Sequence, residues 1–310
     1  MFSGPQSIKG ASRAPAKRQV AASGRAGKRR TRYATAALPE NTAIQRASAV
    51  SAKAPSVVDE EHPTGSAVHA DSRVLFCGSF PPVKRSIRFF YPNPNNDMWK
   101  VLGLVFYDDA DAFYSPVECT SSALSLPHPH PSFKSPRSGT ATRALDEARI
   151  LRFAGSQPIG FFDTCRRVRR HLGNSADSNV EVLERTDVVG DVLLHAPQCA
   201  GIITTGTLAL TMLLHSLAAH GTFRTSTGVP VEVLFKTRQG KYKYNIPPIG
   251  GRLEWLPSEA CAFRNALWIH RGPSTSRALP LKLEDKTMHY RRAVAAHLSI
   301  PLVGAYTHLL

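Results

Sequence analysis

The side chains best suited to chemistry gather in one stretch, residues 74–106. An apolar run there ends at a small-residue turn, GSFPP (78–82), and is followed by an aromatic trio ending at Tyr91, the amide of Asn96 and the carboxyl of Asp97. An aromatic ring can stack on a planar ligand, an amide can read a polar edge or orient water, and a carboxylate can act as a base. The order predicts a strand, a turn, a loop and a helix. Because ligands of open α/β sheets bind beyond the carboxyl ends of the strands, this stretch is the best candidate active-site segment.

The elements that must position these groups follow from the apolar pattern. Four short apolar runs alternate with helical stretches and end in small or polar residues; they are residues 74–77, 158–164, 200–206 and 266–270. This alternation predicts an α/β fold with a central four-stranded, mostly parallel sheet. Right-handed crossovers put the carboxyl ends of parallel strands on one rim. We therefore expect one cleft where four turns converge, at residues 78–82, 163–164, 204–206 and 272–277.

Composition and charge narrow the class of protein. The 310 residues carry a formal net charge of +16, which predicts a polyanionic partner such as nucleic acid or a membrane surface. No apolar run reaches the roughly 18 residues of a membrane-spanning helix. The five cysteines include no C-x-x-C pair, and the twelve histidines include no H-E-x-x-H motif. These features argue against a metal site and favour reduced, buried thiols in an intracellular protein.

Residues 1–72 differ from the rest, with nine Lys or Arg and no acid before Glu40. They are rich in Ala, Ser, Gly and Arg and bury too little surface to fold, which predicts a disordered basic tail before a domain at 73–310. The Arg-rich start is typical of a mitochondrial transit peptide. The cluster KRRTR (28–32) is typical of a nuclear import signal or a nucleic-acid-binding tail. A solvated tail with neither role is the third interpretation, and the lack of an apolar signal core argues against secretion.

Three later segments are polar or basic. Residues 119–140 are rich in Pro, Ser and His, which predicts a disordered surface insertion. Four arginines within residues 166–170 directly follow a predicted strand and form either a solvated basic face or a phosphate contact. The segment KTRQGKYKYN (236–245) predicts a basic hairpin turn, whose tyrosines could also stack or cover phosphate.

The motifs at the predicted rim resemble those of the uracil-DNA glycosylase superfamily. Its mismatch-specific and hypoxanthine-type branches carry a G-S-F-P or G-x-N-P turn and then an aromatic-x-x-P-x-N-x-F-W segment; here these read GSFP (78–81) and YPNPNNDMW (91–99). GPSTSR (272–277) resembles the second motif of the family, which has a Pro-Ser and a nearby Arg. Residues 160–163 and 204–206 look like the ends of its second and third strands. The resemblance implies a three-layer α/β/α fold.

The resemblance implies a catalytic role for Asn96, which matches the asparagine of the P-x-N-x-F-W segment and would orient water or the base. Its alternative role is to cap the following helix, which asparagine does well. Asp97 is a candidate base if Asn96 only binds, and is otherwise an exposed loop residue. Tyr91 occupies the stacking position of the family, or is a core ring. The mismatch-specific branch keeps its catalytic asparagine in the first turn, where this chain has Phe80.

Further roles come from the same resemblance. Ser79 and Phe80 would offer backbone N–H groups to the base, and Asp163 would contact the base or cap the next helix. The residues expected to grip DNA phosphates are Lys84, Arg85, Ser274, Thr275, Ser276 and Arg277.

The second motif departs from the family at two points. Some branches place a histidine directly before Pro-Ser to stabilise the leaving base, where this chain has Gly272. His270 lies two residues earlier on a predicted strand, so we interpret it as structural. The loop also lacks the usual apolar wedge, with only Leu279 nearby.

Together these features predict a monofunctional, DNA-repair glycosylase that flips uracil or another deaminated base out of DNA and hydrolyses its N-glycosidic bond with water. We expect it to act as a monomer, without metal or cofactor, in the nucleus or mitochondrion. The alternative is a catalytically weak or inactive member of this superfamily that binds nucleic acid, which the residues at positions 80 and 272 favour. An enzyme for small nucleotides fits poorly, because the chain has neither a P-loop nor a G-x-G-x-x-G motif.

Overall fold

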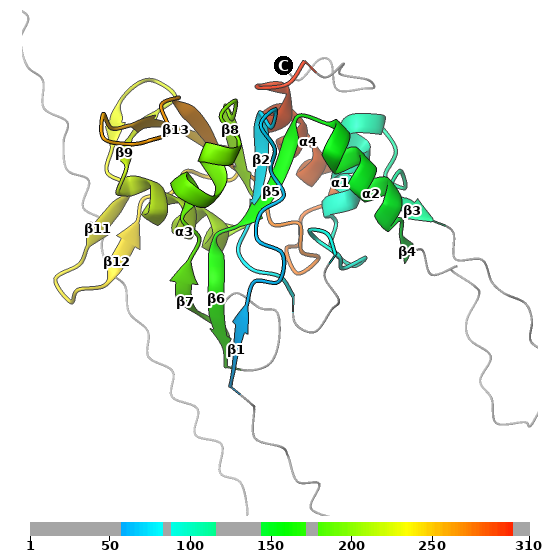
Figure 1. The fold of residues 1–310 in the computed structure, drawn as a ribbon, viewed down its shortest axis with the longest axis horizontal. Coiled ribbons are helices and arrows are strands. Elements are labelled where there is room, and N and C mark those ends of the chain that lie inside the picture. The colour runs from blue at the N-terminus through cyan, green and yellow to red at the C-terminus, as the bar shows by residue number, and fades with distance from the viewer. Residues whose placement is uncertain (1–56, 83–87, 116–143, 172–178, 300–310) are drawn as a thin grey trace, which may run out of the picture. The chain divides into compact units, whose positions relative to one another are not determined.

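The central element is a seven-stranded mixed sheet in the order β10-β9-β13-β14-β8-β2-β5 (Figure 1). The computed structural model describes residues 57–82, 88–115, 144–171 and 179–299. One end of the sheet is parallel and consists of β5 (Ile159–Asp163), the edge strand, followed by β2 (Val74–Gly78), β8 (Gly201–Thr204) and β14 (Leu267–Arg271). These four strands confirm the parallel sheet predicted from four apolar runs.

Three antiparallel strands extend the sheet beyond β14, so the prediction of only four strands is incomplete. They are β13 (Arg252–Pro257), β9 (Gly221–Thr225) and β10 (Pro230–Val231). The outer strands β9 and β10 carry many exposed residues. Their weaker apolar pattern explains why the four apolar runs found in the sequence do not include them.

Helices cover both faces of the sheet, in a three-layer α/β/α arrangement (Figure 1). Along β2, Leu75 and Cys77 join one buried cluster, and Val74 and Phe76 join the other. This alternation is what a strand between two cores requires. The first cluster includes α3 (Thr207–Ala218), the π-helical turn η2 (Val188–Val192) and the 3₁₀ turn η3 (Leu193–His195); the second includes α1 (Met98–Tyr107), α2 (Glu147–Ser156) and α4 (Leu283–Ala295).

A second sheet begins inside the stretch predicted to be a tail. Its three strands, in the order β1-β6-β7, are Val58–Glu61, Cys165–Arg170 and Val180–Arg185. Farther along, Ala67 forms a bridge with Phe161 of β5. The prediction of a disordered tail through residue 72 is therefore wrong for residues 57–72, and the rest of that tail lies outside the described residues.

Ion pairs explain how the acidic strand β1 docks on the basic strand β6. Arg169 donates from Nε to Asp59 over 2.7 Å, and Arg170 donates from Nε to Glu60 over 3.1 Å. The other two arginines of residues 166–170 lie 3.5 and 3.8 Å from carboxylate oxygens of β7. The arginine cluster is thus part of a sheet whose acidic side chains pair with it, an arrangement that neither interpretation from the sequence included.

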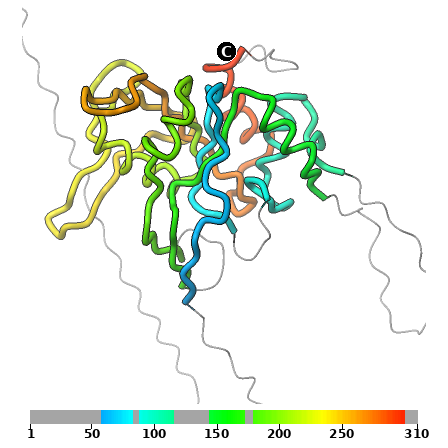
Figure 2. Tube along the Cα trace, in the orientation of Figure 1, coloured from blue at the N-terminus to red at the C-terminus, as the bar shows by residue number. Residues whose placement is uncertain are grey.

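Two small antiparallel pairs complete the described elements. β3 (Tyr114–Ser115) pairs with β4 (Ala144–Leu145), and β11 (Leu234–Lys236) pairs with β12 (Tyr242–Tyr244). The second pair is the predicted basic hairpin, drawn in yellow in Figure 2. The predicted insertion at 119–140 lies outside the described residues. In the part of the chain that the structure describes, no helix is long and apolar enough to cross a membrane, and no three His, Cys, Asp or Glu side chains group as metal ligands.

Candidate active site

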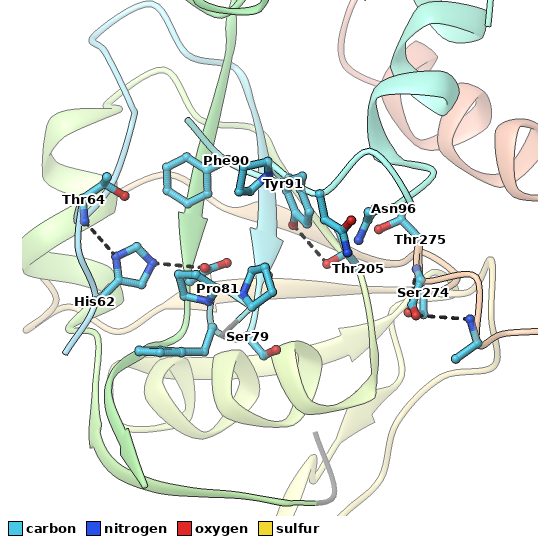
Figure 3. Close-up of a pocket in the computed structure, with 18 of the residues that line it drawn as sticks. His62, Thr64, Ser79, Pro81, Phe90, Tyr91, Asn96, Thr205, Ser274 and Thr275 are labelled. Carbon is cyan, nitrogen blue, oxygen red and sulfur yellow. Dashed lines mark hydrogen bonds and ion pairs between the residues drawn. The ribbon is translucent and has the colours of Figure 1, made fainter. Parts of the chain in front are cut away.

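A pocket of about 490 Å³ opens where the carboxyl ends of the parallel strands meet (Figure 3). Its walls come from the segment after β1, the turn after β2, the loop before α1, the ends of β5 and β8, and the loop after β14. Eight of the twelve site residues predicted from the sequence line it: Ser79, Phe80, Tyr91, Asn96, Asp163, Ser274, Thr275 and Ser276. Asp97 and Arg277 are not among the lining residues, and Lys84 and Arg85 lie outside the described residues.

The floor of the pocket depends on a glycine. Gly78 ends β2 directly opposite Asp163, the last residue of β5. A Cβ atom at this glycine would lie 2.1 Å from Oδ1 of Asp163 and 2.9 Å from the hydroxyl of Tyr91. Since no side chain fits in that space, glycine is required for the two functional groups to approach each other.

Asp163 is held by a histidine that the sequence did not reveal. Nε2 of His62 lies 3.0 Å from Oδ2 of Asp163, and both side chains are less than a tenth exposed. Nδ1 of His62 accepts hydrogen bonds from the backbone N–H groups of Thr64 and Gly65. With Nδ1 used as an acceptor, the ring proton sits on Nε2 and is donated to the carboxylate. Asp163 therefore does not cap a helix, the alternative considered for it, because β6 follows it directly.

Tyr91 is fixed against the end of β8. Its hydroxyl lies 3.1 Å from Oγ1 of Thr205, which itself donates to the carbonyl of Cys77, so the tyrosine is the donor of the pair. Burial, and next the charge of Asp163, raise the pKa of Tyr91 well above its usual value. Its φ of 55° is left-handed, which is uncommon for a bulky residue and indicates that its surroundings hold it in place. The ring lines the pocket and also meets Phe161 edge to face, so Tyr91 packs against the core, while its stacking on a base stays a prediction.

The side-chain oxygen of Asn96 has a structural contact, and its NH₂ group is left for the pocket. Its Oδ1 accepts the backbone N–H of Met98 at the start of α1, over 2.9 Å. The oxygen thus fixes the turn that leads into α1, whose N-cap residue is Asp97 rather than Asn96, while the side chain still lines the pocket (Figure 3). What the side chain can offer a ligand is its NH₂ group, a pure donor.

Asp97 binds other side chains rather than facing the pocket. Its Oδ2 accepts from Nζ of Lys286 over 2.8 Å, and its Oδ1 lies 3.4 Å from Nε of Arg277. Lys286 is only 1% exposed and also donates to the carbonyl of Ser276. Asp97 thus joins the start of α1 to α4 and to the loop after β14. This geometry does not support its expected role as a base and gives it a positioning role.

The loop after β14 forms the opposite wall of the pocket. Asp97 donates its backbone N–H to the carbonyl of Thr275, and Asn96 forms a β-bridge with Ser276. Leu279, the only apolar candidate for a wedge, also lines the pocket. The side chain of Arg277 is half exposed beside Asp97, outside the pocket wall.

Packing explains the glycine before Pro-Ser. A Cβ at Gly272 would lie 2.7 Å from the carbonyl oxygen of Thr204 and 3.1 Å from the ring of Tyr290. The hydroxyl of Tyr290 is occupied, since it donates to the carbonyl of Pro273. His270 points elsewhere and shares a 2.8 Å hydrogen bond with His297, in agreement with its predicted structural role.

The turn after β2 is stabilised by one arginine of strand β6. Arg170 is almost fully buried, donates to the carbonyl of Pro81 and lies 5.4 Å from the centre of the Phe80 ring. The other edge of that ring meets His62 at 5.6 Å. The ring of Phe80 is therefore packed between Arg170 and His62, and the binding of a base by its backbone N–H group stays a prediction.

Further lining residues were not assigned from the sequence. Thr205, Phe90 and Asn93 line the pocket beside the predicted groups, together with His62. Thr205 follows a predicted strand end, so that position alone could have suggested it. No comparable local signal exists for His62.

Comparison with protein-family profiles and with curated proteins gave no match. Among solved structures, the chain is similar to the solution NMR structure of a candidate uracil DNA glycosylase from Methanosarcina acetivorans. The two share 16% sequence identity with a TM-score of 0.40, over 76% of this chain and 96% of that one.

Proposed function

We propose that this protein is a DNA glycosylase that removes uracil or another deaminated base. The observation that carries the proposal is the pairing of an acceptor and a donor in one aromatic-walled pocket. Asp163 supplies the acceptor, Asn96 supplies the NH₂ donor and Tyr91 supplies the ring. The volume of about 490 Å³ suits a base with its sugar. The motif resemblance of the first and last loops to the uracil-DNA glycosylase superfamily supports the same reaction.

The acceptor and donor match the feature that deaminated bases share. Uracil and hypoxanthine carry a ring N–H beside a carbonyl, whereas cytosine and adenine carry a bare ring nitrogen beside an amino group. An ionised Asp163 only accepts hydrogen bonds, so it fits the ring N–H and repels the bare nitrogen. The NH₂ group of Asn96 fits the carbonyl and clashes with an amino group. Because mismatched polar groups in a closed site discriminate strongly, this pair would reject cytosine and adenine, the bases from which uracil and hypoxanthine arise.

The same groups suggest how the bond is broken. Flipping brings the base into the pocket at a cost of a few kcal/mol. As the N-glycosidic bond breaks, its electron pair moves to the base, and the sugar gains oxocarbenium character. A donor from Asn96 to the base carbonyl stabilises the developing negative charge. Water then adds its oxygen to C1′, and its proton ends on the base nitrogen, which leaves an abasic site.

DNA binding is supported by the charge of the chain and by the loop after β14. The net charge of +16 favours a polyanion. Ser274, Thr275 and Ser276 line the pocket, and Arg277 lies just outside it. We assign these four residues, with Lys84 and Arg85, to the flanking phosphates. The resemblance of the motifs places the chain, within this proposal, in the mismatch-specific or hypoxanthine-type branch of the superfamily. Its basic start would direct it to the nucleus or the mitochondrion.

The test is a survey of substrates with the full chain. Oligonucleotides with one uracil, hypoxanthine, xanthine or G·T mismatch are incubated with the protein, and alkali-labile abasic sites are counted. We expect cleavage at uracil or hypoxanthine, and loss of that activity in Asp163→Ala. If no substrate is cleaved while binding stays tight and salt-dependent, the enzyme proposal fails.

The second candidate function is nucleic-acid binding without effective catalysis. It is favoured by the packed ring of Phe80, the ion-paired Asp97 and the occupied oxygen of Asn96, which together leave few groups to activate water. The survey distinguishes the two, since a binding protein would retain each oligonucleotide intact.

A further inference from the structure

A second pocket, of about 410 Å³, lies between α4 and the start of β13. Its lining includes the end of β14 but shares no residue with the candidate active site. The basic side chains in its wall are Arg252, Arg271, Arg292, His270 and His289. No Asp or Glu is among the described residues that line it. A concave site with this composition attracts anions.

Two of the arginines are held in place by neighbours that carry no charge. The guanidinium of Arg252 lies 4.3 Å from the centre of the Trp268 ring. Arg271 donates from Nη1 to the carbonyl of Pro247 over 2.7 Å and from Nη2 to Oγ1 of Thr207 over 3.3 Å. Neither contact neutralises the guanidinium, so both positive charges remain available to a ligand. A side chain that is already ordered loses less entropy on binding.

The turn before β13 closes the pocket against α4. Gly250 has a left-handed φ of 82°, and a Cβ there would lie 2.6 Å from Nδ1 of His289. Its N–H donates to the carbonyl of Arg271, and the N–H of Arg271 donates back to the carbonyl of Gly251. His289, Arg292 and Ala293 follow the helical spacing of three and four residues, so they share one face of α4. The wall is therefore built from rigid elements.

The titration of nearby histidines agrees with a positive local field. Burial and then Arg292 lower the pKa of His289, and the carboxylate of Asp285, one turn away, opposes this only weakly. Burial, then His297 and Arg252, lower the pKa of His270 to about 3. Burial is the larger cause of both lowered pKa values, and the neighbouring arginines add to it.

We propose that this pocket is an anion site that binds a phosphate group beside Arg252 and Arg271, with Arg292 and His289 on the wall formed by α4. Guanidinium groups pair with phosphate through planar forks, which makes arginine the preferred partner for it. The proposal is independent of base excision. The phosphate could belong to a DNA strand that also enters the first pocket, since Gly272 of this site directly precedes the loop that walls the first. It could equally belong to a small phosphate compound.

The experiment measures two ligands on the full chain. Pyrophosphate is titrated while the imidazole proton resonances of His289 are followed by NMR, and an undamaged oligonucleotide is titrated by fluorescence anisotropy at several salt concentrations. The test variant is Arg252→Glu with Arg292→Glu. The control is Arg149→Glu with Arg152→Glu on α2, which changes the net charge equally on two exposed residues. Unfolding midpoints confirm that both variants fold.

In the wild type we expect pyrophosphate to shift the imidazole proton resonances of His289, and in the test variant we expect no such shift. If the phosphate belongs to a DNA strand, the test variant also binds the oligonucleotide roughly tenfold more weakly, and the slope of log binding constant against log salt concentration falls by about 1 to 2. The control variant changes both quantities much less. If the source is a small compound, oligonucleotide affinity stays equal in both variants. The proposal is overturned if pyrophosphate leaves the wild-type resonances of His289 unchanged and the two variants bind the oligonucleotide alike.

Discussion

Replacing Gly78 by alanine should disturb the candidate active site more than any surface change. The added Cβ would lie 2.1 Å from Oδ1 of Asp163, whereas ordinary contacts begin at 3.4 Å. The carboxylate oxygen would have to move by about 1.3 Å, the difference between these two distances. Backbone relief is limited, because β2 is hydrogen-bonded to β5 on one side and β8 on the other.

The expected cost follows from this displacement. Overpacking of a filled site typically costs about 1–3 kcal/mol, so Gly78→Ala should lower the free energy of unfolding by that amount. It also pushes Asp163 away from the 3.0 Å contact with His62. Because a misplacement of about 1 Å can cost about 100-fold in rate, base release should fall by roughly that factor.

A second glycine provides the matched control. Gly155 lies in α2, and a Cβ added there would meet no atom within 4 Å. Gly155→Ala should leave base release unchanged and stabilise the protein by up to about 1 kcal/mol, since alanine favours helices. Urea unfolding and single-turnover base release are measured on both variants. The reasoning is refuted if Gly78→Ala is as stable and as active as the control.

Three further predictions concern single side-chain contacts. Asn96→Asp should keep the side-chain oxygen that accepts from Met98, and with it the stability, but lose the NH₂ donor and most of the base release. Asn96→Ala should lose base release and also lower the free energy of unfolding, measured in urea, by about 1 kcal/mol. Equal activity of the wild type and both variants would contradict this prediction. Asp97→Ala should lower the free energy of unfolding by about 3–5 kcal/mol, because the buried ammonium of Lys286 loses its carboxylate. Adding Lys286→Met to this variant should restore part of the lost stability. An unchanged urea midpoint in Asp97→Ala would show that the Asp97–Lys286 pair does not stabilise the fold. The folded-state pKa values of His270 and His297, about 3 and about 4, lie below the usual 6.5, so the unfolded chain binds more protons at pH 4–6.5 and stability should fall as the pH drops through that window. Replacing both histidines by leucine should flatten the pH dependence measured by urea unfolding, and an unaltered slope would refute the assignment.

The parallel core of the fold could be predicted because its signal is local. Each strand there is a short run buried on both faces, so it is apolar throughout and ends at a small or polar residue. The same pattern placed the ends of these strands on one rim and brought eight predicted site residues into one pocket. The motif resemblance supplied their expected roles, which remain predictions.

The N-terminal part of the site could not be predicted in this way. β1 has the sequence VDEE and is mostly exposed, so it shows no apolar pattern. It is held by arginines that lie about 110 residues later, and His62 meets Asp163 across 101 residues. Contacts between charged groups at such separations leave no trace in local periodicity. The exposed acids therefore looked like part of a solvated tail.

Asp97 shows a different limit. From the sequence it was a polar residue next to Asn96 and thus a candidate base. Only the three-dimensional arrangement shows that Lys286, from the last helix, reaches its carboxylate. Spacing along a chain can suggest which groups come close to the rim, but not which way each side chain points.

The most direct test of the proposed function compares two oligonucleotides that differ only in one base, uracil or cytosine. The full chain is mixed in excess with each, and the released free base is quantified by chromatography in a single turnover. We predict that both oligonucleotides bind with similar affinity, that uracil is released with one abasic site per molecule, and that cytosine is retained. Tight binding of both without release of either base, or equal release of both, would contradict the account.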